Sequence, residues 1–531
     1  MRAIALRWAW PAALVACLAA AGMLSVATGL DANWDLKNYH AYDAYAFLND
    51  RLTWDAAPAQ IQTFHNPLAD LGFHALVARI ASPRIIAFAM AMPAGIAAFL
   101  LLRMLVALFP AAMQGRWGWI AAAFAIGTTG SSGRAVIGST MNEWPPAMLL
   151  MVSLTAIVSS IARRGAPALH ALALAGFATG LAMGLKLTYG VFAVALVVAL
   201  PSFGTWRERT HRAAWTIAFL LAGFLVTYGF WGARLWSEFG NPFFPYFNNV
   251  FHSPWWENEA WFDRNYGPRN ALEAIFFPFV VMRDYARGGE APFIDARLAA
   301  LWIAGAAAAV AAFVRRVQAS SPEARNWIFL ATFAAVAYAA WLQLYGIYRY
   351  LVPLELLSGP LIVGALVMIC RTAAQRAAAI GVVTLALVTT TQPPDLGRLP
   401  FRGAYFDVAP PDIAPHSLVI LGPYDPMSYA IEFLRADARF VSPNNNFLNY
   451  SQRNLLEQRI HALIASHEGP LYSLDLRAHD RLADILEHFG LERVRSTCLP
   501  IRSYLDDSAM QLCRLERMAK KNPAVLSNGG V

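Results

Sequence analysis

The chain has 531 residues, of which 57% are hydrophobic and only 14% charged, and its mean hydropathy is +0.42. Soluble globular proteins carry about a quarter charged residues, so this chain has too few to cover an ordinary soluble core. The composition argues against a soluble enzyme, a disordered chain or a nucleic-acid-binding protein. It predicts a multi-pass membrane protein, whose formal net charge of +8 has to be explained by where the basic residues lie.

Long apolar segments recur along the first 392 residues. A helix needs about 20 apolar residues to cross the hydrocarbon core of a bilayer. The first segment, 8–30, is uncharged and longer than the apolar core of a signal peptide, so we expect it to remain as a helix. The sequence predicts about eleven spans, at 8–30, 85–109, 117–136, 144–162, 165–185, 187–200 with its flanks, 213–233, 298–314, 327–345, 350–370 and 377–392.

Basic residues gather in every second connection between these segments. By the positive-inside rule these connections and the N-terminus face the cytoplasm. The outer loops 31–84 and 234–296 and the tail from 393 onward then lie on the extracytoplasmic side of the inner (cytoplasmic) membrane. The arginines that set the orientation in the membrane thus account for much of the net positive charge. This charge is therefore not evidence for a nucleic-acid partner. The residues concerned are Arg2, Arg7, Arg116, Arg163, Arg164, Arg207, Arg209, Arg212, Arg315, Arg316, Arg325, Arg371 and Arg376.

Residues 60–80 have two interpretations, a short membrane span or a helix that lies on the outer surface. A span here would reverse the side of every later connection and would place the arginine pairs outside. The distribution of basic residues therefore favours a juxtamembrane helix.

The tail, 393–531, has a different composition from the membrane module, 1–392. Its charge density rises, and short apolar runs alternate with polar helical stretches, which predicts a small extracytoplasmic α/β domain. Cys498 and Cys513 lie in this tail, where a disulfide and two free thiols are both compatible with the sequence. The predicted strands are 417–422, 438–442, 470–476 and 491–499, and the predicted helices are 427–435, 452–466 and 477–489.

Four charged residues at the ends of apolar segments fall on the predicted outer side: Asp35, Glu143, Lys186 and Arg349. Charges at a membrane edge are expensive and suggest a function. Each also has an ordinary structural explanation, such as helix capping for the acids and interfacial anchoring for the bases. A carboxylate can accept the proton of an attacking sugar hydroxyl, whereas lysine and arginine can stabilise a phosphate leaving group.

These residues, in this order, resemble the GT-C class of integral-membrane glycosyltransferases, similar to the protein mannosyltransferase and lipid A aminoarabinose transferase group. Asp35 matches the acid of the first outer loop, Glu143 the second acid, Arg349 the late basic residue, and Lys186 in GLAMGLKLTYG a lysine-bearing turn. GNPFFPYFNNVFHSPWW, at 240–256, is similar to an outer-loop pattern of such proteins. The resemblance covers 1–392. Asp35 is followed by LKNYH and lacks the adjacent second acid that is common in several of these families, so the exact family and the identity of the transferred sugar stay open.

The resemblance implies a GT-C-like fold and a hexosyl- or pentosyltransferase that uses a polyprenyl-phosphate-linked sugar. The acceptor would be a glycan, a lipid or a protein, and transfer would take place with inversion outside the cytoplasmic membrane. Asp35 would be the general base, Glu143 would assist acceptor or metal binding, and Lys186 and Arg349 would hold the donor phosphate. No residue is assigned as a metal ligand, and the resemblance leaves open whether a divalent metal ion is needed.

Histidines and aromatic residues of the outer loops are candidate substrate contacts. The histidines lie near aspartates, but their spacing fits no standard metal signature, so substrate contact or an interfacial position is favoured over metal binding. The aromatic rings can stack on a sugar or anchor a loop at the lipid headgroups. The candidates are Tyr39, His40, His65, Tyr348, Trp255 and Trp256. The GSSG sequence at 130–133 is interpreted as a helix-end turn and not as a phosphate-binding loop.

Two other functions compete with a glycosyltransferase. A transporter or lipid flippase would also place charged groups near its helices, although such proteins often contain repeated halves, which this sequence does not display. An assembly subunit whose tail binds a partner is the second alternative.

Overall fold

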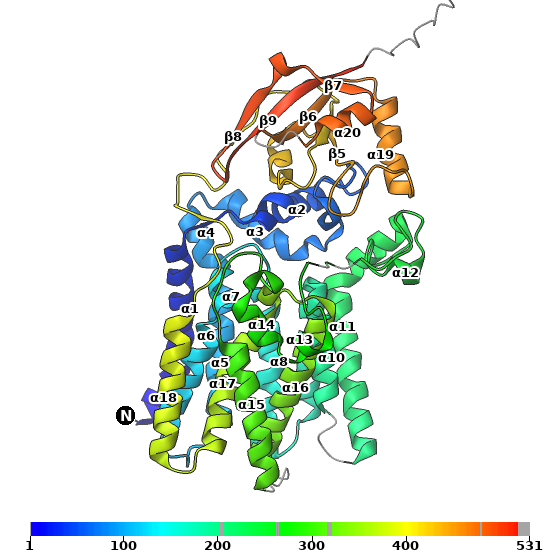
Figure 1. Cartoon of the computed structure of the whole chain (residues 1–531). Coiled ribbons are helices and arrows are strands. Elements are labelled where there is room, and N and C mark those ends of the chain that lie inside the picture. Colours follow the sequence, from blue (N-terminus) through cyan, green and yellow to red (C-terminus); the bar gives the residue numbers. More distant parts are fainter. Residues whose placement is uncertain are drawn as a thin grey trace, which may run out of the picture. The chain divides into compact units, whose positions relative to one another are not determined.

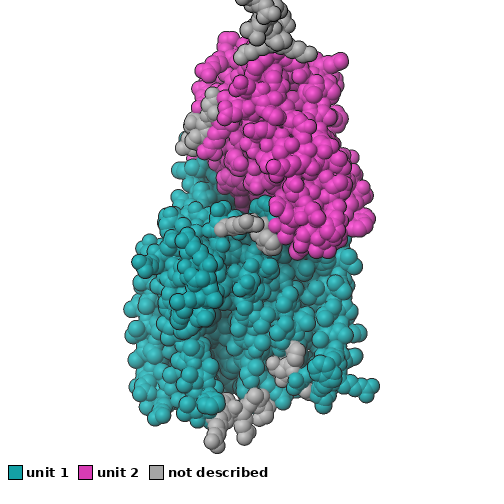
Figure 2. Space-filling model, turned by 45° about the vertical axis from the view of Figure 1, so that its right-hand side comes forward, with its two compact units in different colours: residues 1–33, 68–234, 261–405 teal, residues 34–67, 235–260, 406–531 magenta. Residues whose placement is uncertain are grey.

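The computed structural model describes residues 2–200, 205–261, 263, 265–315, 321–477 and 481–518; Arg316 lies outside them. The chain forms two compact units, each assembled from segments that are far apart in the sequence (Figure 2). Unit 1 consists of 1–33, 68–234 and 261–405, and unit 2 of 34–67, 235–260 and 406–531. A domain boundary at residue 392 stays a prediction.

Unit 1 is a bundle of long apolar helices that run side by side (Figure 1). Each of the eleven predicted segments is mainly helical, although 85–109 and 117–136 each contain two helices, and this confirms the mainly α, multi-pass membrane architecture. The helices are α1 (Arg2–Thr28), α4 (Pro83–Met90), α5 (Met92–Leu108), α6 (Arg116–Thr128), α8 (Trp144–Arg164), α9 (Leu169–Leu185), α10 (Gly190–Ala199), α11 (Trp206–Phe239), α15 (Arg297–Val314), α16 (Pro322–Leu344), α17 (Val352–Ile369) and α18 (Ala373–Thr390).

Within the described chain, eight helical segments are long and apolar enough to cross a membrane. The other three predicted spans are shorter: α6 ends at Thr128, and α9 and α10 are separated by the turn that contains Lys186. The eight segments are Ala9–Thr28, Pro83–Leu108, Trp144–Arg164, Trp206–Phe239, Arg297–Val314, Pro322–Leu344, Tyr348–Ile369 and Ala373–Thr390.

Residues 60–80 do not form one helix. They contain η2 (Gln60–Phe64), η3 (Pro67–Ala69) and α3 (Asp70–Arg79), and none of these is long enough to span a membrane. Helix length thus excludes the membrane-span interpretation. Unit 1 also contains short elements between its long helices, namely α7 (Ser131–Ala135), η4 (Leu187–Tyr189), α13 (Ala271–Ile275), α14 (Phe277–Arg283), η6 (Tyr285–Arg287), η7 (Tyr348–Leu351) and the antiparallel pair β1 (Leu30–Asp31) and β2 (Arg398–Leu399).

Unit 2 contains a mixed seven-stranded sheet, in the order β3-β8-β9-β6-β4-β5, with β7 also paired to β9. The parallel strands β4, β5 and β6 and the helices that follow them confirm the predicted α/β character of the tail. The sequence analysis did not predict strands β8 and β9. The elements are β3 (Val408–Ala409), β4 (Leu418–Leu421), η8 (Ser428–Phe433), β5 (Arg439–Val441), α19 (Leu455–Ser466), β6 (Leu471–Leu476), α20 (Ala483–His488), β7 (Leu491–Arg493), η9 (Arg495–Thr497), β8 (Leu499–Ser503) and β9 (Asp506–Arg517).

Residues 34–67 of the first outer loop belong to unit 2, where they bond to the sheet. The Arg51 guanidinium donates to both oxygens of Asp55, at 2.7 and 2.9 Å, and also to the backbone carbonyls of Ala436 and Ala438. Asp55 in turn accepts the backbone N–H of Phe440 in β5 at 2.9 Å. The loop elements are η1 (Leu36–His40) and α2 (Ala41–Leu48), and α12 (Asn248–Phe251) comes from the second outer loop.

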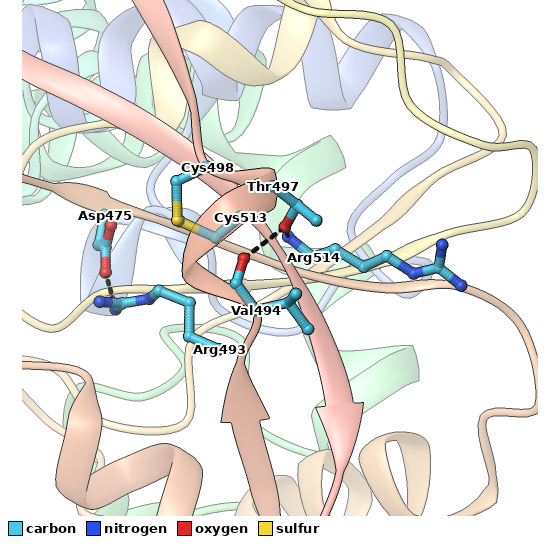
Figure 3. The surroundings of a disulfide bond; sticks show 7 residues. All are labelled: Asp475, Arg493, Val494, Thr497, Cys498, Cys513 and Arg514. Carbon is cyan, nitrogen blue, oxygen red and sulfur yellow. Dashed lines mark hydrogen bonds and ion pairs between the residues drawn. A yellow bond between two sulfur atoms is a disulfide. The ribbon is translucent and has the colours of Figure 1, made fainter.

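Cys498 and Cys513 form a disulfide, which decides between the two alternatives left by the sequence (Figure 3). Cys513 lies in β9, and Cys498 follows η9, so the bond ties the connection between β7 and β8 to the long strand. Hydrogen bonds reinforce the same junction, because the Thr497 hydroxyl donates to the Val494 carbonyl at 2.6 Å and accepts from the Arg514 N–H at 3.0 Å.

Candidate functional site

Glu143 occupies the N-terminal end of α8 in unit 1, and its side chain is fully buried. A carboxylate is favoured at a helix N-terminus because the unsatisfied N–H groups give that end a partial positive charge. Pro145 follows within the first turn, where a missing N–H costs no helical hydrogen bond. The local sequence therefore starts a helix and places an acid at its N-cap position.

Lys186 ends α9, in extended backbone with φ of −147°. The C-terminal end of a helix favours a cation, and the next element, η4, begins immediately after the lysine. The Lys186 ammonium forms an ion pair with Oε1 of Glu143 and donates to the Met141 carbonyl at 2.9 Å. This turn therefore brings a cation from one helix end to the acid at another.

Arg349 lies in η7, directly before α17. Its Nε is 4.0 Å from Oε1 of Glu143, and its Nη1 is 3.2 Å from Oε2 of Glu290. The ring of Tyr350 lies under both cations, 5.1 Å from the Lys186 nitrogen and 5.4 Å from the Arg349 guanidinium carbon. The negative face of an aromatic ring attracts cations, so Tyr350 holds them on one surface.

Hydrogen bonds hold the segment that precedes Glu143. Oδ2 of Asp31 accepts from the backbone N–H and the hydroxyl of Thr140, at 2.8 and 2.9 Å. Asn142 has left-handed backbone, with φ of 56°, and its side-chain amide donates to Asp70 at 2.5 Å. Asparagine tolerates this conformation better than most residues. The Tyr189 hydroxyl donates to the Glu143 carbonyl at 2.8 Å, so the backbone that carries the acid is held on both sides.

The charges of this cluster differ in their exposure. The side chains of Lys186 and Arg349 are 16% and 11% exposed, whereas Glu143 is 0% exposed and Glu290 is 32% exposed. The two cations are therefore partly exposed, whereas Glu143 is shielded from solvent. Arginine and lysine together suit a phosphate, because the guanidinium offers a planar set of donors and the ammonium a compact charge.

The structure thus brings together three of the four predicted charged residues: Glu143, Lys186 and Arg349. Asp35 belongs to unit 2, where it is 5% exposed at the start of η1 and accepts the Tyr39 hydroxyl at 3.3 Å. The Tyr39 ring contacts the rings of His40 and His65, with centroids 4.0 and 5.3 Å away. Asp35 and the three predicted substrate contacts Tyr39, His40 and His65 therefore lie together within unit 2, where all but the half-buried His65 are buried.

The remaining predicted contacts are packed against neighbouring residues. Trp256 is 4% exposed, and its indole N–H donates to the Phe447 carbonyl at 3.2 Å. Trp255 packs edge-on against Phe239, at 5.5 Å between centroids. Tyr348 is 3% exposed and packs against Phe293 at 4.7 Å. Sugar stacking and headgroup anchoring by these three residues both stay predictions.

A second buried charged group in unit 1 was missed by the sequence reasoning. Arg297 is fully buried and contacts Asp295 at 2.8 Å. Glu355, inside α17, accepts the backbone N–H groups of Ser132 and Gly133 at 2.9 and 2.8 Å. The 130–133 segment starts α7, which confirms the helix-end turn. The available signal was the charge of Glu355 inside the otherwise apolar segment 350–370. Arg297 and Asp295 lie directly before the predicted span 298–314 and carried no such signal.

Among the residues that the structure describes, no three His, Cys, Asp or Glu side chains are grouped so that they could hold a metal ion. A metal requirement stays a prediction. The sequence did not indicate three further contacts, because the two partners of each lie far apart along the chain. They are Glu290 with Arg349, Asp70 with Asn142, and Asp31 with Thr140.

The sequence matches no known family model and no curated protein. Two solved structures resemble the fold. One is the oligosaccharyltransferase of Archaeoglobus fulgidus in its apo form, at 12% identity over 87% of this chain and 69% of that one, with a TM-score of 0.45. The other is ArnT from Cupriavidus metallidurans bound to undecaprenyl phosphate, at 12% identity over 96% and 98%, with a TM-score of 0.38. Both likenesses are too weak to transfer an activity, which has to be argued from this chain's own residues.

Proposed function

We propose that this chain is a multi-pass membrane glycosyltransferase of the inner membrane. It moves one hexose or pentose from a polyprenyl-phosphate-linked donor to a glycan, lipid or protein acceptor on the extracytoplasmic side. The observation that supports this most is the pair of partly exposed cations, Lys186 and Arg349, that meet on the buried carboxylate of Glu143 at helix ends. Such a pair suits an anionic group carried by a membrane lipid.

In the proposed reaction the acceptor oxygen bonds to the anomeric carbon of the sugar while the bond from that carbon to the phosphate oxygen breaks. The electron pair leaves with the phosphate, whose added negative charge Lys186 and Arg349 stabilise. The hydroxyl proton passes to a carboxylate, for which we propose Asp35 as general base. Attack on the face opposite to the leaving group inverts the anomeric centre.

Glu143 has a positioning role in this proposal. Its fully buried carboxylate contacts both cations, so it fixes where they lie and reduces their net charge. This differs from the role in acceptor or metal binding that the resemblance implied. The burial of Glu143 supports the positioning role, because an acceptor or a metal would have to displace Lys186 first.

Replacement of Asp35 tests the catalytic assignment. With the full chain in proteoliposomes and a labelled polyprenyl-phosphate sugar, Asp35→Asn should abolish transfer and leave donor binding intact, because only the proton acceptor is lost. Asp43→Asn is the matched control, a buried carboxylate in α2 of the same unit. Normal turnover by Asp35→Asn would contradict the assignment, and solute transport without a new glycoside would favour the transporter alternative.

Replacement of the cations tests the phosphate assignment separately. Lys186→Gln and Arg349→Gln should each weaken donor binding, whereas Arg325→Gln should not. Arg325 is a matched control because it lies at the start of α16 and donates to the Gly165 carbonyl at 2.7 Å. Mass spectrometry of lipid-linked glycans from cells with and without the protein would then identify the sugar and the acceptor.

A further inference from the structure

Two carboxylates contact the same guanidinium but differ in how they are held. Glu143 is fully buried beneath Arg349, whereas Glu290 is 32% exposed and contacts Nη1 of Arg349 at 3.2 Å. Glu290 lies in the connection between η6 and α15, after two glycines and before Pro292. The structure therefore places one permanent and one peripheral anion on Arg349.

The connection that carries Glu290 is fixed on both sides of it. The Gly288 carbonyl accepts the backbone N–H of Tyr348 at 2.7 Å, and Ile294 exchanges two backbone hydrogen bonds with Gln392, at 3.0 and 2.9 Å. A long glutamate side chain can rotate away from Arg349 while these backbone contacts remain. Displacement of Glu290 therefore requires a side-chain movement and no rearrangement of the helices.

The charges determine when this movement is favoured. Within this cluster the two cations, Lys186 and Arg349, contact two carboxylates, Glu143 and Glu290. A polyprenyl-phosphate sugar is a phosphodiester with one negative charge, so its arrival would leave one excess anion in the cluster. Departure of Glu290 restores the balance, because the phosphate then takes its place beside Arg349.

We infer that Glu290 is an internal substitute for the donor phosphate: it occupies the anion position on Arg349 and must leave for the donor to bind. Glu290 thereby sets the affinity of the cation pair for lipid phosphates, an inference that rests on the proposed function. The released polyprenyl phosphate is a monoester with a charge of roughly −1.5 to −2 near pH 7. The return of Glu290 to Arg349 then competes with this product and promotes its release.

The test measures binding of undecaprenyl phosphate to the full chain in detergent, by titration of wild type, Glu290→Gln and Glu290→Ala. Loss of the competing charge should tighten binding about three- to tenfold in both variants. Glu273→Gln is the matched control, since Glu273 is 27% exposed and pairs with Arg287 at 2.9 Å in the same outer segment. The affinity of Glu273→Gln for undecaprenyl phosphate should equal that of wild type. In turnover assays Glu290→Gln should lower both KM and kcat, because the donor binds more tightly and the product leaves more slowly.

Unchanged or weaker binding by both Glu290 variants, with binding still lost in Lys186→Gln and Arg349→Gln, would overturn the inference and leave the proposed phosphate site standing. A purely structural ion pair would give this result, with a lower melting temperature for Glu290→Gln and Glu273→Gln alike. Binding that is insensitive to Lys186→Gln and Arg349→Gln would instead overturn the phosphate site itself, and the inference with it.

Discussion

The carboxylate of Glu143 contacts both cations of the site, so its burial depends on them. A buried carboxylate without a counter-ion is costly, and breaking a buried pair by removing one partner typically costs about 3–5 kcal/mol. Because Lys186 comes from the end of α9 and Glu143 from the start of α8, this pair also joins two helix ends. A residue that anchors the site electrostatically therefore also contributes to the stability of the bundle.

A double-mutant cycle tests this dependence. Glu143→Gln and Lys186→Met should each lower the free energy of unfolding, and the double variant should lose less than the sum, with a coupling energy of about 0.5–3 kcal/mol. The measurement is unfolding of the purified chain in mixed micelles. Glu143→Gln combined with Arg325→Gln is the control pair, and its effects should be additive. Additive effects in the Glu143–Lys186 cycle as well would show that the pair is not coupled.

At the scale of elements, α9 and α11 approach each other through glycines. Gly176, Gly180 and Gly184 are spaced four apart on α9, and a Cβ atom added to Gly180 would collide with the Leu220 carbonyl of α11. The Thr227 hydroxyl of α11 also donates to the Leu181 carbonyl at 3.1 Å. Small residues at this spacing allow the backbones of membrane helices to pack closely, which compensates for the weak hydrophobic drive within a bilayer.

Gly180→Ala should therefore destabilise the chain by about 1–3 kcal/mol, because the new methyl group overpacks a contact with a backbone carbonyl that cannot move aside. Gly305→Ala in α15 is the matched control, since nothing lies within 4 Å of a Cβ atom at that position. Its stability should equal or slightly exceed that of wild type, because alanine is the better helix former. The same unfolding assay compares them, and equal stabilities of the two variants would refute the close-packing argument.

The disulfide closes a loop of 15 residues between η9 and β9. Closing a loop of this length stabilises a folded chain by about 3 kcal/mol in the chain-entropy account. The variant in which serine replaces both Cys498 and Cys513 should be less stable than wild type by about this free energy. Reductant should lower the melting temperature of wild type but not that of the variant. The control is replacement of Cys17 and Cys370, which are free cysteines. If reductant left the wild-type melting curve unchanged, the bond would have no stabilising role.

At the scale of the whole molecule, the orientation in the membrane can be tested directly. The arginine-rich connections predict a cytoplasmic face, and the disulfide in the tail favours an oxidising compartment for the tail. Alkaline phosphatase, which is active only outside the cytoplasm, should be active when fused after Gly403 and inactive when fused after Arg164. Fusion after Gly240, in the second outer loop, is an independent control and should be active. The opposite pattern would invert the proposed topology.

Much of the architecture followed from the sequence because its signals are local. Each apolar segment had to be a helix, since a backbone in lipid has to satisfy its hydrogen bonds within the segment. Glu143 before Pro145 and Lys186 between two apolar segments also marked helix ends, which is why their positions were recognisable. Strands β8 and β9 were missed although Met510 and Leu512 alternate with polar residues and although β8 ends at Ser503, just before β9 begins at Asp506. Only the pairing of β9 with β6 is remote in the sequence.

The sequence by itself thus determined that this is a multi-pass helical membrane protein with an α/β tail, and it selected the charged residues at the helix ends. Only the tertiary structure decided that Lys186 and Arg349 share Glu143, that Glu290 lies on Arg349, and that Glu355 holds the turn at 130–133. The physical reason is that helix formation depends on neighbours along the chain. Ion pairs and hydrogen bonds between helix ends depend instead on packing between residues that lie from 43 to 222 positions apart in the chain.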